Sequence, residues 1–280
     1  MTSSRTLLIT GVSGGLGAAF ARVAAKLGHR VVGTVRRHDD ARRFEDQVGA
    51  PALLLDLADH SAMPALVVEA ERLVGPIDVL VNNAGFGQEG ALEESPLDAL
   101  RRQLDVNVIG QVALIQAVLP GMRERRAGHI VNVTSMVGSV GFPGVSFYSG
   151  AKFAMEGIGE ALSKEVRAFG IHVTSFAPGQ FRTDWAGRSM ERSARLFADY
   201  DAVIDPLREA RSAKSGRQPG DPEKAAALLM RIIACTQPPS RIFVGPDAVA
   251  IASQKVKRMT AEIAGWEAAS RATDHDCSDA

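Results

Sequence analysis

Tyr148 and Lys152, in the stretch YSGAK, are the residues whose types and spacing most directly indicate chemistry. On a helix, side chains four positions apart share one face. A phenol has an ordinary pKa of about 10, so it exchanges protons poorly at neutral pH, but a nearby ammonium favours the phenolate and lowers that pKa. The pair predicts a proton donor, Tyr148, that Lys152 makes acidic enough to react.

Ser135 and Asn107 are candidates for the same site. Ser135 follows the apolar run HIVNVT, at the carboxyl end of a predicted strand, where open α/β sheets gather their ligands, so it could hydrogen-bond a substrate carbonyl. A nucleophilic role is less expected, because no GxSxG motif surrounds it. Asn107 lies in a strongly apolar helix, where asparagine is unfavourable and usually has a specific role. Its position alone favours a solvent-facing side chain over a local distortion that holds a water.

A glycine-rich turn, TGVSGGLG at residues 10–17, follows the first apolar run. Glycines there permit a tight turn and let backbone N–H groups at a helix N-terminus approach a pyrophosphate. The strict GxGxxG spacing is absent, so a purely structural turn is the alternative. The position after a first strand favours the pyrophosphate site.

The end of the second strand, GTVRR, bears on the choice of cofactor. A carboxylate there would bind a ribose 2′-hydroxyl, whereas a guanidinium suits a 2′-phosphate. Val35 occupies the place of the acid, and Arg36 and Arg37 follow, which predicts NADP over NAD. The alternative is that both arginines are solvated loop charges.

Asp56 ends the next apolar run, ALLLD. Its carboxylate could accept a hydrogen bond from an adenine amino group, with Leu57 packing at the adenine edge. Equally, Asp56 could be an acid at the N-terminus of a helix over 61–74.

Apolar runs of strand length alternate with segments of helical periodicity, at 6–10, 30–35, 52–55, 77–81, 129–134, 171–177 and 241–245. Such runs are typical of strands buried on both faces. The pattern predicts an α/β fold, a doubly wound Rossmann-type parallel sheet of about seven strands in one domain over residues 1–280. A helix is expected after Ser95, with Ser95 as N-cap, Pro96 at N1 and Asp98 at N3, ending at Pro120–Gly121.

Bulk composition narrows the function classes. The 32 basic and 32 acidic residues cancel, so no overall field favours nucleic acid. Cys235 and Cys277 stand far apart, without metal-ligand spacing, so no metal site or disulfide is expected. No apolar run reaches the ~18 residues of a membrane span, and the N-terminus lacks the pattern of a signal peptide. We therefore expect a cytoplasmic protein that acts on small molecules.

These motifs together resemble the short-chain dehydrogenase/reductase family over roughly residues 5–245. The family's TGxxxGxG motif is matched by Thr10, Gly11, Gly15 and Gly17, its NNAG motif by Asn82, Asn83, Ala84 and Gly85, and its catalytic tetrad by Asn107, Ser135, Tyr148 and Lys152. PGQFRT, residues 178–183, is similar to the family's PGxxxT segment.

The resemblance implies reversible hydride transfer between NADP(H), with NAD(H) as the alternative cofactor, and a carbonyl or secondary alcohol. Lys152 would hold the nicotinamide ribose, Ser135 would position the carbonyl, Asn107 would anchor a water, and Thr183 would touch the carboxamide. The expected cofactor contacts are Gly11, Ser13, Gly15, Leu16, Gly17, Arg36, Arg37, Asp56, Leu57, Asn83, Ala84, Gly85, Tyr148, Lys152, Pro178, Gly179, Phe181 and Thr183. NADP-preferring relatives often carry a basic residue where this chain has Gly14, so Arg36 must carry most of the discrimination.

Two later segments are expected to serve substrate and assembly. Residues 181–220, the lid segment, mix apolar and arginine residues and predict an amphipathic lid over an apolar substrate; a surface helical pair is the alternative. Residues 246–270 predict an added C-terminal helix, before a frayed tail at 271–280. Three roles stay open for this helix: it covers the active site, it covers a partner subunit, or it only closes the edge of the sheet. The resemblance implies a homodimer or homotetramer through the 97–119 helix and the helix that carries Tyr148, whose small residues are Ala151, Ala154, Gly157, Gly159 and Ala161.

Two other functions stay open at this stage. One is a sensor or scaffold that binds NADP(H) without turnover, which the complete catalytic tetrad disfavours. The other is the related epimerase or dehydratase branch, which the glycine spacing and chain length disfavour. The identity of the carbonyl substrate is not predicted.

Overall fold

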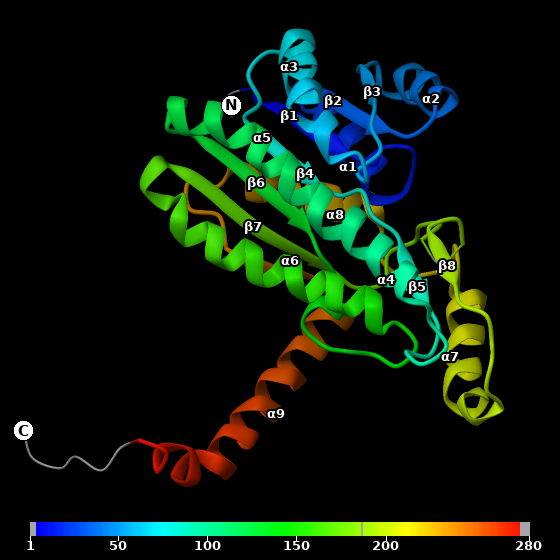
Figure 1. Ribbon diagram of the computed structural model, residues 1–280. Helices are drawn as coiled ribbons and strands as arrows, with labels where there is room; N and C mark the ends of the chain where they lie inside the picture. Colours follow the sequence, from blue (N-terminus) through cyan, green and yellow to red (C-terminus); the bar gives the residue numbers. More distant parts are fainter. Residues whose placement is uncertain (1–3, 186, 275–280) are drawn as a thin grey trace, which may run out of the picture.

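The computed structural model describes residues 4–185 and 187–274, and its centre is a seven-stranded sheet in which every neighbouring pair is parallel (Figure 1). The strand order is β3-β2-β1-β4-β6-β7-β9. The strands are β1 Thr6–Thr10, β2 Arg30–Val35, β3 Ala52–Leu54, β4 Val79–Asn82, β6 Gly128–Val133, β7 Ile171–Pro178 and β9 Arg241–Val244. The predicted doubly wound α/β sheet is confirmed, with strand ends shifted by one or two residues.

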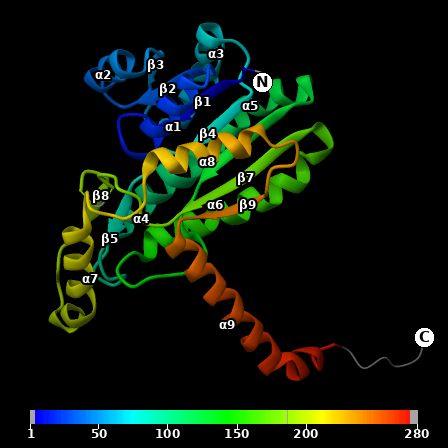
Figure 2. The ribbon, with the colours of Figure 1, turned by 180° about the vertical axis from the view of Figure 1, so that it is seen from behind.

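Helices cover both faces of this sheet because its strands are apolar on both sides. One layer holds α1 Gly15–Lys26, α2 His38–Val48 and α8 Pro222–Ala234; the other holds α3 Met63–Val74, α5 Gly110–Arg125 and α6 Ser146–Glu165 (Figures 1 and 2). Between the first layer and the sheet, the ring of Phe20 in α1 meets that of Phe176 in β7 edge to face at 5.7 Å. Short 3₁₀ turns occur at His60–Ala62, Met136–Gly138, Arg167–Phe169 and Ala198–Tyr200.

The strand order reverses between β1 and β4, so the connections leave the sheet in opposite directions there. In open parallel sheets, this reversal creates a crevice at the carboxyl ends of the strands, where ligands bind. The glycine-rich turn follows β1, and the NNAG segment follows β4. The fold therefore brings the two motifs to the same end of adjacent strands.

The helix after Ser95 differs from the prediction at both ends. α4 spans Leu97–Leu104 with Pro96 in the N-cap position, and Ser95 Oγ donates to Ala91 O at 2.8 Å instead of capping it. A π-helical turn over Asp105–Ile109 joins α4 to α5. Pro120 lies inside α5, which is tolerated because both Pro120 and Gln116, whose carbonyl loses its partner, are exposed to water.

Leu97–Arg125 is also, among the described residues, the one helical stretch long and apolar enough to cross a membrane by length and composition. The expectation that no such run exists was therefore wrong. A buried core helix meets the same criterion. Here Leu114, Ile115, Val118 and Met122 are buried against the sheet, so the apolar character of this helix is used in the core.

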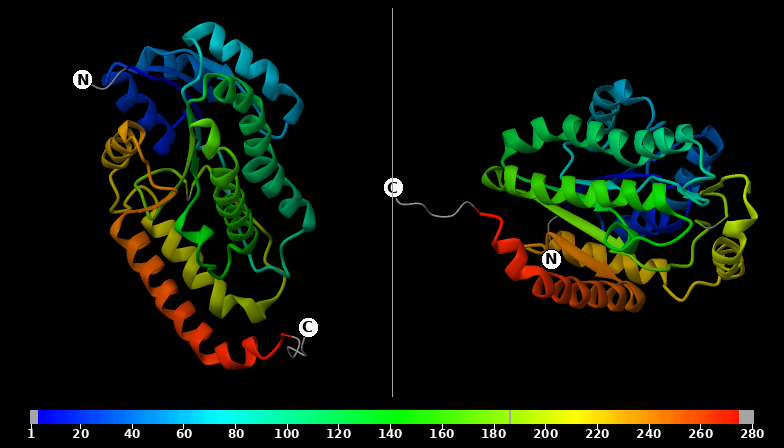
Figure 3. Two further views of the ribbon diagram at one scale, coloured as in Figure 1. Left: turned by 90° about the vertical axis from the view of Figure 1, so that its left-hand side faces the viewer. Right: turned by 60° about the horizontal axis from the view of Figure 1, so that its bottom comes forward.

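Two features stand outside the main layers. A small parallel pair, β5 Gly87–Glu89 with β8 Met190–Arg192, was not predicted. β8 and α7 Asp201–Lys214 form most of the lid segment, which lies beside the sheet and is joined there by β5 (Figure 1). α9, Pro246–Arg271, leaves the body after β9 and projects away from it (Figures 2 and 3). The C-terminal helix is thus confirmed one residue longer, and residues 275–280 of the expected tail lie outside the described residues.

Candidate active site

Tyr148 and Lys152 lie in the first turns of α6, and both side chains are buried. Lys152 Nζ donates to Val133 O, the last residue of β6, at 2.8 Å and lies 5.8 Å from the centroid of the Tyr148 ring. The helix thus presents both groups to the carboxyl end of β6, on one face, as their spacing predicted.

Ser135 joins this pair from the end of β6. Its backbone is extended, and it caps the 3₁₀ turn Met136–Gly138 by accepting a hydrogen bond from Val137 N at 3.3 Å. Its side chain is also hydrogen-bonded to Tyr148. A carbonyl oxygen beside this hydrogen bond would meet two hydroxyl groups at once.

The protonation of the site is set first by burial. Burial raises the pKa of Tyr148, and the hydrogen bond with Ser135 opposes that rise. Burial also lowers the pKa of Lys152 to about 8, against the opposing charge of Glu156. Lys152 is not among the causes of this pKa shift, in which burial dominates, so the lowering of the pKa of Tyr148 by Lys152 stays a prediction. The raised pKa keeps the phenol protonated, as a proton donor requires.

Asn107 is fully buried, so the expectation of a solvent-facing side chain was wrong. It lies in the π-helical turn, where it accepts a hydrogen bond from Phe86 N at 3.1 Å and donates one to Phe86 O at 2.8 Å. A Cβ on Gly85 would lie 2.7 Å from Asn107 Oδ1, so the close approach needs glycine there. The local distortion considered as the alternative is present; an anchored water stays a prediction.

The glycine-rich turn is held against the NNAG segment. Thr10 Oγ1 accepts from the backbone N–H groups of Asn83 and Ala84, each at 3.0 Å, and Asn83 Nδ2 donates to Thr10 O at 2.9 Å. Gly11 has φ 73°, and a Cβ on Gly17 would lie 2.4 Å from Asn83 Nδ2. Only glycine therefore fits at positions 11 and 17 of the turn.

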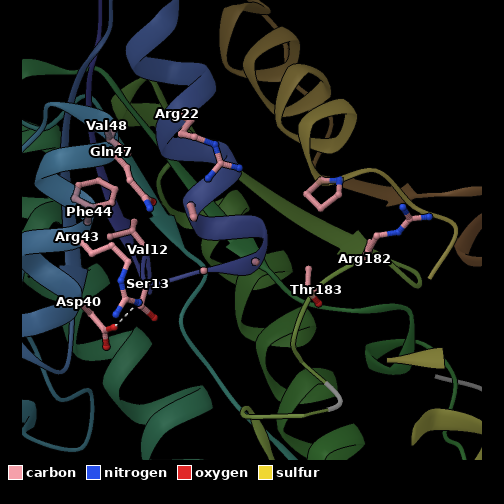
Figure 4. Close-up of a pocket in the computed structure, with 14 residues that line it drawn as sticks. Val12, Ser13, Arg22, Asp40, Arg43, Phe44, Gln47, Val48, Arg182 and Thr183 are labelled. Carbon is pink, nitrogen blue, oxygen red and sulfur yellow. Dashed lines mark hydrogen bonds and ion pairs between the residues drawn. The ribbon is translucent and has the colours of Figure 1, made fainter. Parts of the chain in front are cut away.

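This turn fits a pyrophosphate, because the first N–H groups of α1 point out of it and glycines leave room for close approach. A cavity of about 240 Å³ opens beside it. Figure 4 shows Asp40 and Arg43 on one side of the start of α1 and Arg182 and Thr183 on the other. Ser13 lines this cavity, whereas the predicted contact Leu16 packs partly into the core.

The two arginines after β2 have different surroundings. Both are exposed, but Arg37 Nε donates to Asp40 Oδ2 at 2.9 Å, an ion pair across the start of α2. The structure gives Arg36 no hydrogen bond or ion pair within the described ranges. Arg36 is thus the guanidinium available at the end of β2, and Arg37 is already engaged.

Asp56 does not cap a helix, so that alternative was wrong. Its Oδ1 accepts from Ala58 N at 3.0 Å in a turn, and Asp59 occupies the N-cap position of the following 3₁₀ turn. Leu57 is buried behind it. Asp56 is exposed at the carboxyl side of β3, and its contact with an adenine stays a prediction.

The segment 178–183 lies at the end of β7, beside the glycine-rich turn. A Cβ on Gly15 would lie 3.5 Å from the Thr183 methyl group, so Thr183 is close to the turn. Gly179 and Phe181 face the body instead: a Cβ on Gly179 would lie 2.1 Å from Asp247 Oδ1, and Phe181 is buried in the core. Pro178 is the last residue of β7.

Trp185, from the lid segment, packs over Tyr148. The ring centroids of Trp185 and Tyr148 are 5.1 Å apart, and Phe142 and Val145 pack in the same apolar cluster. The wall that faces Tyr148 is therefore apolar.

A buried carboxylate that the sequence analysis missed ties the lid segment to the body. Glu89 of β5 is fully buried and pairs with Arg211 at 2.6 Å, Arg192 at 2.9 Å and Arg208 at 3.5 Å. Arg192 is therefore not a solvated surface charge, and Arg195 also pairs, with Asp201 and Asp205. No pattern within GQE marks Glu89, since its partners lie more than a hundred residues later.

The small residues expected to pair subunits do not share one face. Ala151 is buried, and a Cβ on Gly159 would meet side chains of the sheet, so both pack inward. Gly157 faces open space, and Ala161 is exposed. Only part of this series is available to another subunit.

The fold and this cluster define a Rossmann-type oxidoreductase, and comparisons with known proteins agree. Residues 5–194 match the family model described as short chain dehydrogenase. The oxidoreductase BOA17 of Botryotinia fuckeliana is 35% identical over 95% of this chain and 97% of its own length. The 3-ketodihydrosphingosine reductase of Bacteroides thetaiotaomicron is 36% identical over 86% of this chain and 87% of its own.

Among solved structures, a short-chain dehydrogenase from Streptomyces avermitilis superposes with a TM-score of 0.91 at 36% identity, covering 97% of this chain and 99% of that one. The chain belongs to the short-chain dehydrogenase/reductase family and is an NAD(P)-dependent oxidoreductase of that family.

Proposed function

We propose that this enzyme transfers hydride reversibly between NADP(H) and the carbonyl or secondary alcohol of an apolar small molecule. The observation that carries the proposal is the cluster at the carboxyl end of β6, where buried Tyr148 is hydrogen-bonded to Ser135 and Lys152 stands one helical turn behind. A neutral phenol in a water-poor site is suited to protonate a carbonyl oxygen as negative charge develops on it.

Each side chain has a role that its position supports. Ser135 and Tyr148 together hold the carbonyl oxygen, and Tyr148 Oη gives it a proton. When bound, the nicotinamide supplies the hydride that reaches the carbonyl carbon. Lys152 brings positive charge to the site while its ammonium is protonated, and Asn107 fixes the backbone at Phe86 beside it. In the oxidation direction, Tyr148 must first lose its proton, so alcohol oxidation is favoured at higher pH.

The preference for NADP rests on cations near the expected 2′-phosphate. Arg36 is exposed after β2, and Val35 stands where an acid would favour NAD. A second guanidinium comes from the lid segment: Arg188 Nη2 lies 3.3 Å from the position of a Cβ on Gly14. We infer that Arg188, although its Nε donates to Asp184 Oδ2 at 2.8 Å, adds positive charge near Gly14, the position that is often basic in NADP-preferring relatives.

Two matched variants test this preference. Arg36→Ala should weaken NADPH binding by roughly 10- to 100-fold and leave NADH binding almost unchanged, because a charge-assisted contact is worth about 1.5–3 kcal/mol. Arg37→Ala is the control, since Arg37 is engaged with Asp40. Fluorescence titrations with both nucleotides measure the effect. Equal losses in the two variants, or tighter binding of NADH by the unmodified enzyme, would overturn the preference.

The apolar substrate is supported by the cluster of Trp185, Phe142 and Val145 around Tyr148. The name of one relative, 3-ketodihydrosphingosine reductase, also denotes reduction of a ketone. A screen of aliphatic and cyclic ketones with NADPH would identify the substrate class.

Tyr148→Phe tests the catalytic assignment. Removing the hydroxyl should lower kcat at least ~100-fold, as expected for general-acid catalysis, while NADPH binding stays within a few-fold. Full activity in this variant would refute the assignment. If the unmodified enzyme binds NADPH but turns over none of the carbonyl panel, the chain is a nucleotide sensor or scaffold instead.

A further inference from the structure

A buried carboxylate, Glu156, lies one helical turn beyond Lys152 on α6 and is only 3% exposed. Burying a carboxylate is costly unless partners bind it. Here Thr134 Oγ1 donates to Glu156 Oε1, and Arg241 Nε of β9 donates to Glu156 Oε2 at 2.7 Å. A group held at this cost beside the catalytic cluster is a candidate for a part in the reaction.

Glu156 continues the series of reacting residues along α6. Tyr148, Lys152 and Glu156 follow one another at intervals of four, so they lie on one face of the helix over successive turns. All three side chains are buried. α6 lies along the sheet and packs on β7 (Figure 1), and this face meets the carboxyl end of β6. The carboxylate therefore belongs to the same buried face as the phenol and the ammonium.

Three consecutive residues at the end of β6 bind this face of α6. Each pair joins one residue of the strand end to one turn of the helix: Val133 with Lys152, Thr134 with Glu156, and Ser135 with Tyr148. The bond to Glu156 is made by the middle residue of the three. Thr134 is thereby fixed between the residue that accepts from the ammonium and the one that is hydrogen-bonded to the phenol.

The charge of Glu156 also acts on Lys152. Burial lowers the pKa of Lys152 to about 8, and the negative charge of Glu156 opposes that fall. Charges attract more strongly in a buried, water-poor site than in solvent. Without the carboxylate, burial would be less opposed, and the ammonium would lose its proton at a lower pH.

Other charges on the elements that pack against α6 are engaged elsewhere or exposed. Arg241 of β9 binds Glu156 itself and lies 3.9 Å from Glu160. Glu89 of β5 is paired with arginines of the lid segment. The titratable side chains of α4, β7 and the turn Arg167–Phe169 are exposed, and Asp105 in the π-helical turn is half-buried. Among the charged groups of the described residues, Glu156 is the one that raises the pKa of Lys152.

We propose that Glu156 is a positioning residue of this active site, whose carboxylate, fixed by Thr134 and Arg241, stabilises the ammonium of Lys152 and holds the end of β6 against α6. The inference rests on the proposed function, in which the ammonium assists carbonyl reduction. Arg241 moderates the effect, because its guanidinium competes with Lys152 for the same negative charge.

Glu156→Gln removes the charge and keeps the shape. The amide oxygen can still accept from Thr134, so the end of β6 stays in place. Carbon-13 NMR of the lysine-labelled enzyme measures the titration of Lys152, whose signal is identified by its loss in Lys152→Met. Lys152 should lose its proton at a pH about one unit lower in Glu156→Gln than in the unmodified enzyme, because a neighbouring opposite charge favours the charged form.

The pH dependence of carbonyl reduction gives a second measurement. At pH 8, Glu156→Gln should be roughly fivefold slower than the unmodified enzyme, since a group that titrates near pH 7 is about nine-tenths deprotonated there and one that titrates near pH 8 is about half deprotonated. At pH 6 the loss should almost disappear, because Lys152 is protonated in both enzymes. A purely structural role of Glu156 would instead lower the rate by the same factor at both pH values.

Arg241→Gln should act in the opposite direction. It removes the competing cation and leaves the carboxylate, so Lys152 should keep its proton to a higher pH than in the unmodified enzyme. The Arg241 side chain is 39% exposed, so this variant keeps the test available if Glu156→Gln does not fold, which far-UV circular dichroism checks.

Glu160→Gln is the matched control. Glu160 lies on the next turn of α6 and also near Arg241, but its side chain is 57% exposed and pairs with Lys164 at 3.0 Å. Water screens an exposed charge, so this variant should leave the titration of Lys152 unchanged.

Three outcomes would overturn the proposal: an unchanged titration of Lys152 in Glu156→Gln, a shift of the same sign in Arg241→Gln, or an equal shift in Glu160→Gln. Failure of the proposed function gives a different result. The unmodified enzyme would then reduce none of the carbonyl panel, while opposite shifts of the Lys152 signal in Glu156→Gln and Arg241→Gln would still support the coupling of Glu156 to Lys152.

Discussion

Glu89→Gln should loosen β8 and α7, the part of the lid segment that Glu89 holds, while Arg182 and Thr183 at the start of the segment keep their place beside the nucleotide cavity. Glu89 is the shared partner of three arginines, Arg192 in β8 and Arg208 and Arg211 in α7. The glutamine keeps the shape and one acceptor oxygen but removes the charge. The three guanidiniums then face one another without a carboxylate between them.

The size of the effect follows from burial. Removing one partner of a buried ion pair costs about 3–5 kcal/mol. Glu89 is fully buried, but its partners are 20–35% exposed and can regain some hydration, so we take the lower end, about 3 kcal/mol. At about 1.4 kcal/mol for each factor of ten, the closed lid becomes roughly a hundredfold less favoured. Because Glu89 joins only β5 and the lid segment, most of this cost is local.

Steady-state kinetics and amide hydrogen exchange measure the effect of Glu89→Gln. KM for the carbonyl substrate should rise by up to roughly a hundredfold, and the amides of α7 should exchange faster, while the NADPH dissociation constant stays within a few-fold. Glu93→Gln is the control, since Glu93 is exposed and only accepts a hydrogen bond from Tyr200 Oη. Unchanged KM and unchanged exchange in Glu89→Gln would refute the tie between this carboxylate and the lid.

Two further predictions concern the nucleotide and proton sites. Gly17→Ala should weaken NADPH binding by roughly 10- to 100-fold, because the added Cβ would lie 2.4 Å from Asn83 Nδ2 and overpacking costs about 1–3 kcal/mol. Fluorescence titration with NADPH measures the loss. Gly157→Ala is the control, because a Cβ at that position meets open space. Carbonyl reduction should slow as pH rises through about 8, where Lys152 loses its proton. Since this pKa lies below the ordinary 10.5, the unfolded chain binds more protons between the two values, so stability rises with pH there while activity falls. A pH–rate profile that is flat through this range would contradict the role of the ammonium.

The sheet could be predicted from the sequence because strands buried on both faces are almost wholly apolar. β5 and β8 could not, because GQE and MER are polar and short. They are strands through their backbone ladder with each other, to which the ion pair of Glu89 with Arg192 adds. The stop predicted at Pro120 failed because proline is tolerated on the exposed side of a helix. Local patterns therefore predicted the elements of the core and missed those that depend on distant partners.

In the candidate site, too, features set by one helix could be predicted and features set by distant segments could not. The spacing of Tyr148 and Lys152 is a property of one helix and could be read directly. The burial of Asn107 depends on Phe86, from another segment, and could not. The engagement of Arg37 could have been found, since Asp40 follows it at three residues, a spacing at which opposite charges pair on a helix.

The pairing of β5 with β8 limits how this enzyme can be redesigned. One way to change the substrate preference of such an enzyme is to replace its lid segment with that of a relative, treating the segment as an independent unit. Here the segment is completed by a strand and a carboxylate encoded about a hundred residues earlier. A transplanted lid that lacks arginines at the positions of Arg192, Arg208 and Arg211 would leave Glu89 as an unpaired buried charge. The exchangeable unit is therefore discontinuous, and a chimera must carry residues 87–89 together with the lid segment.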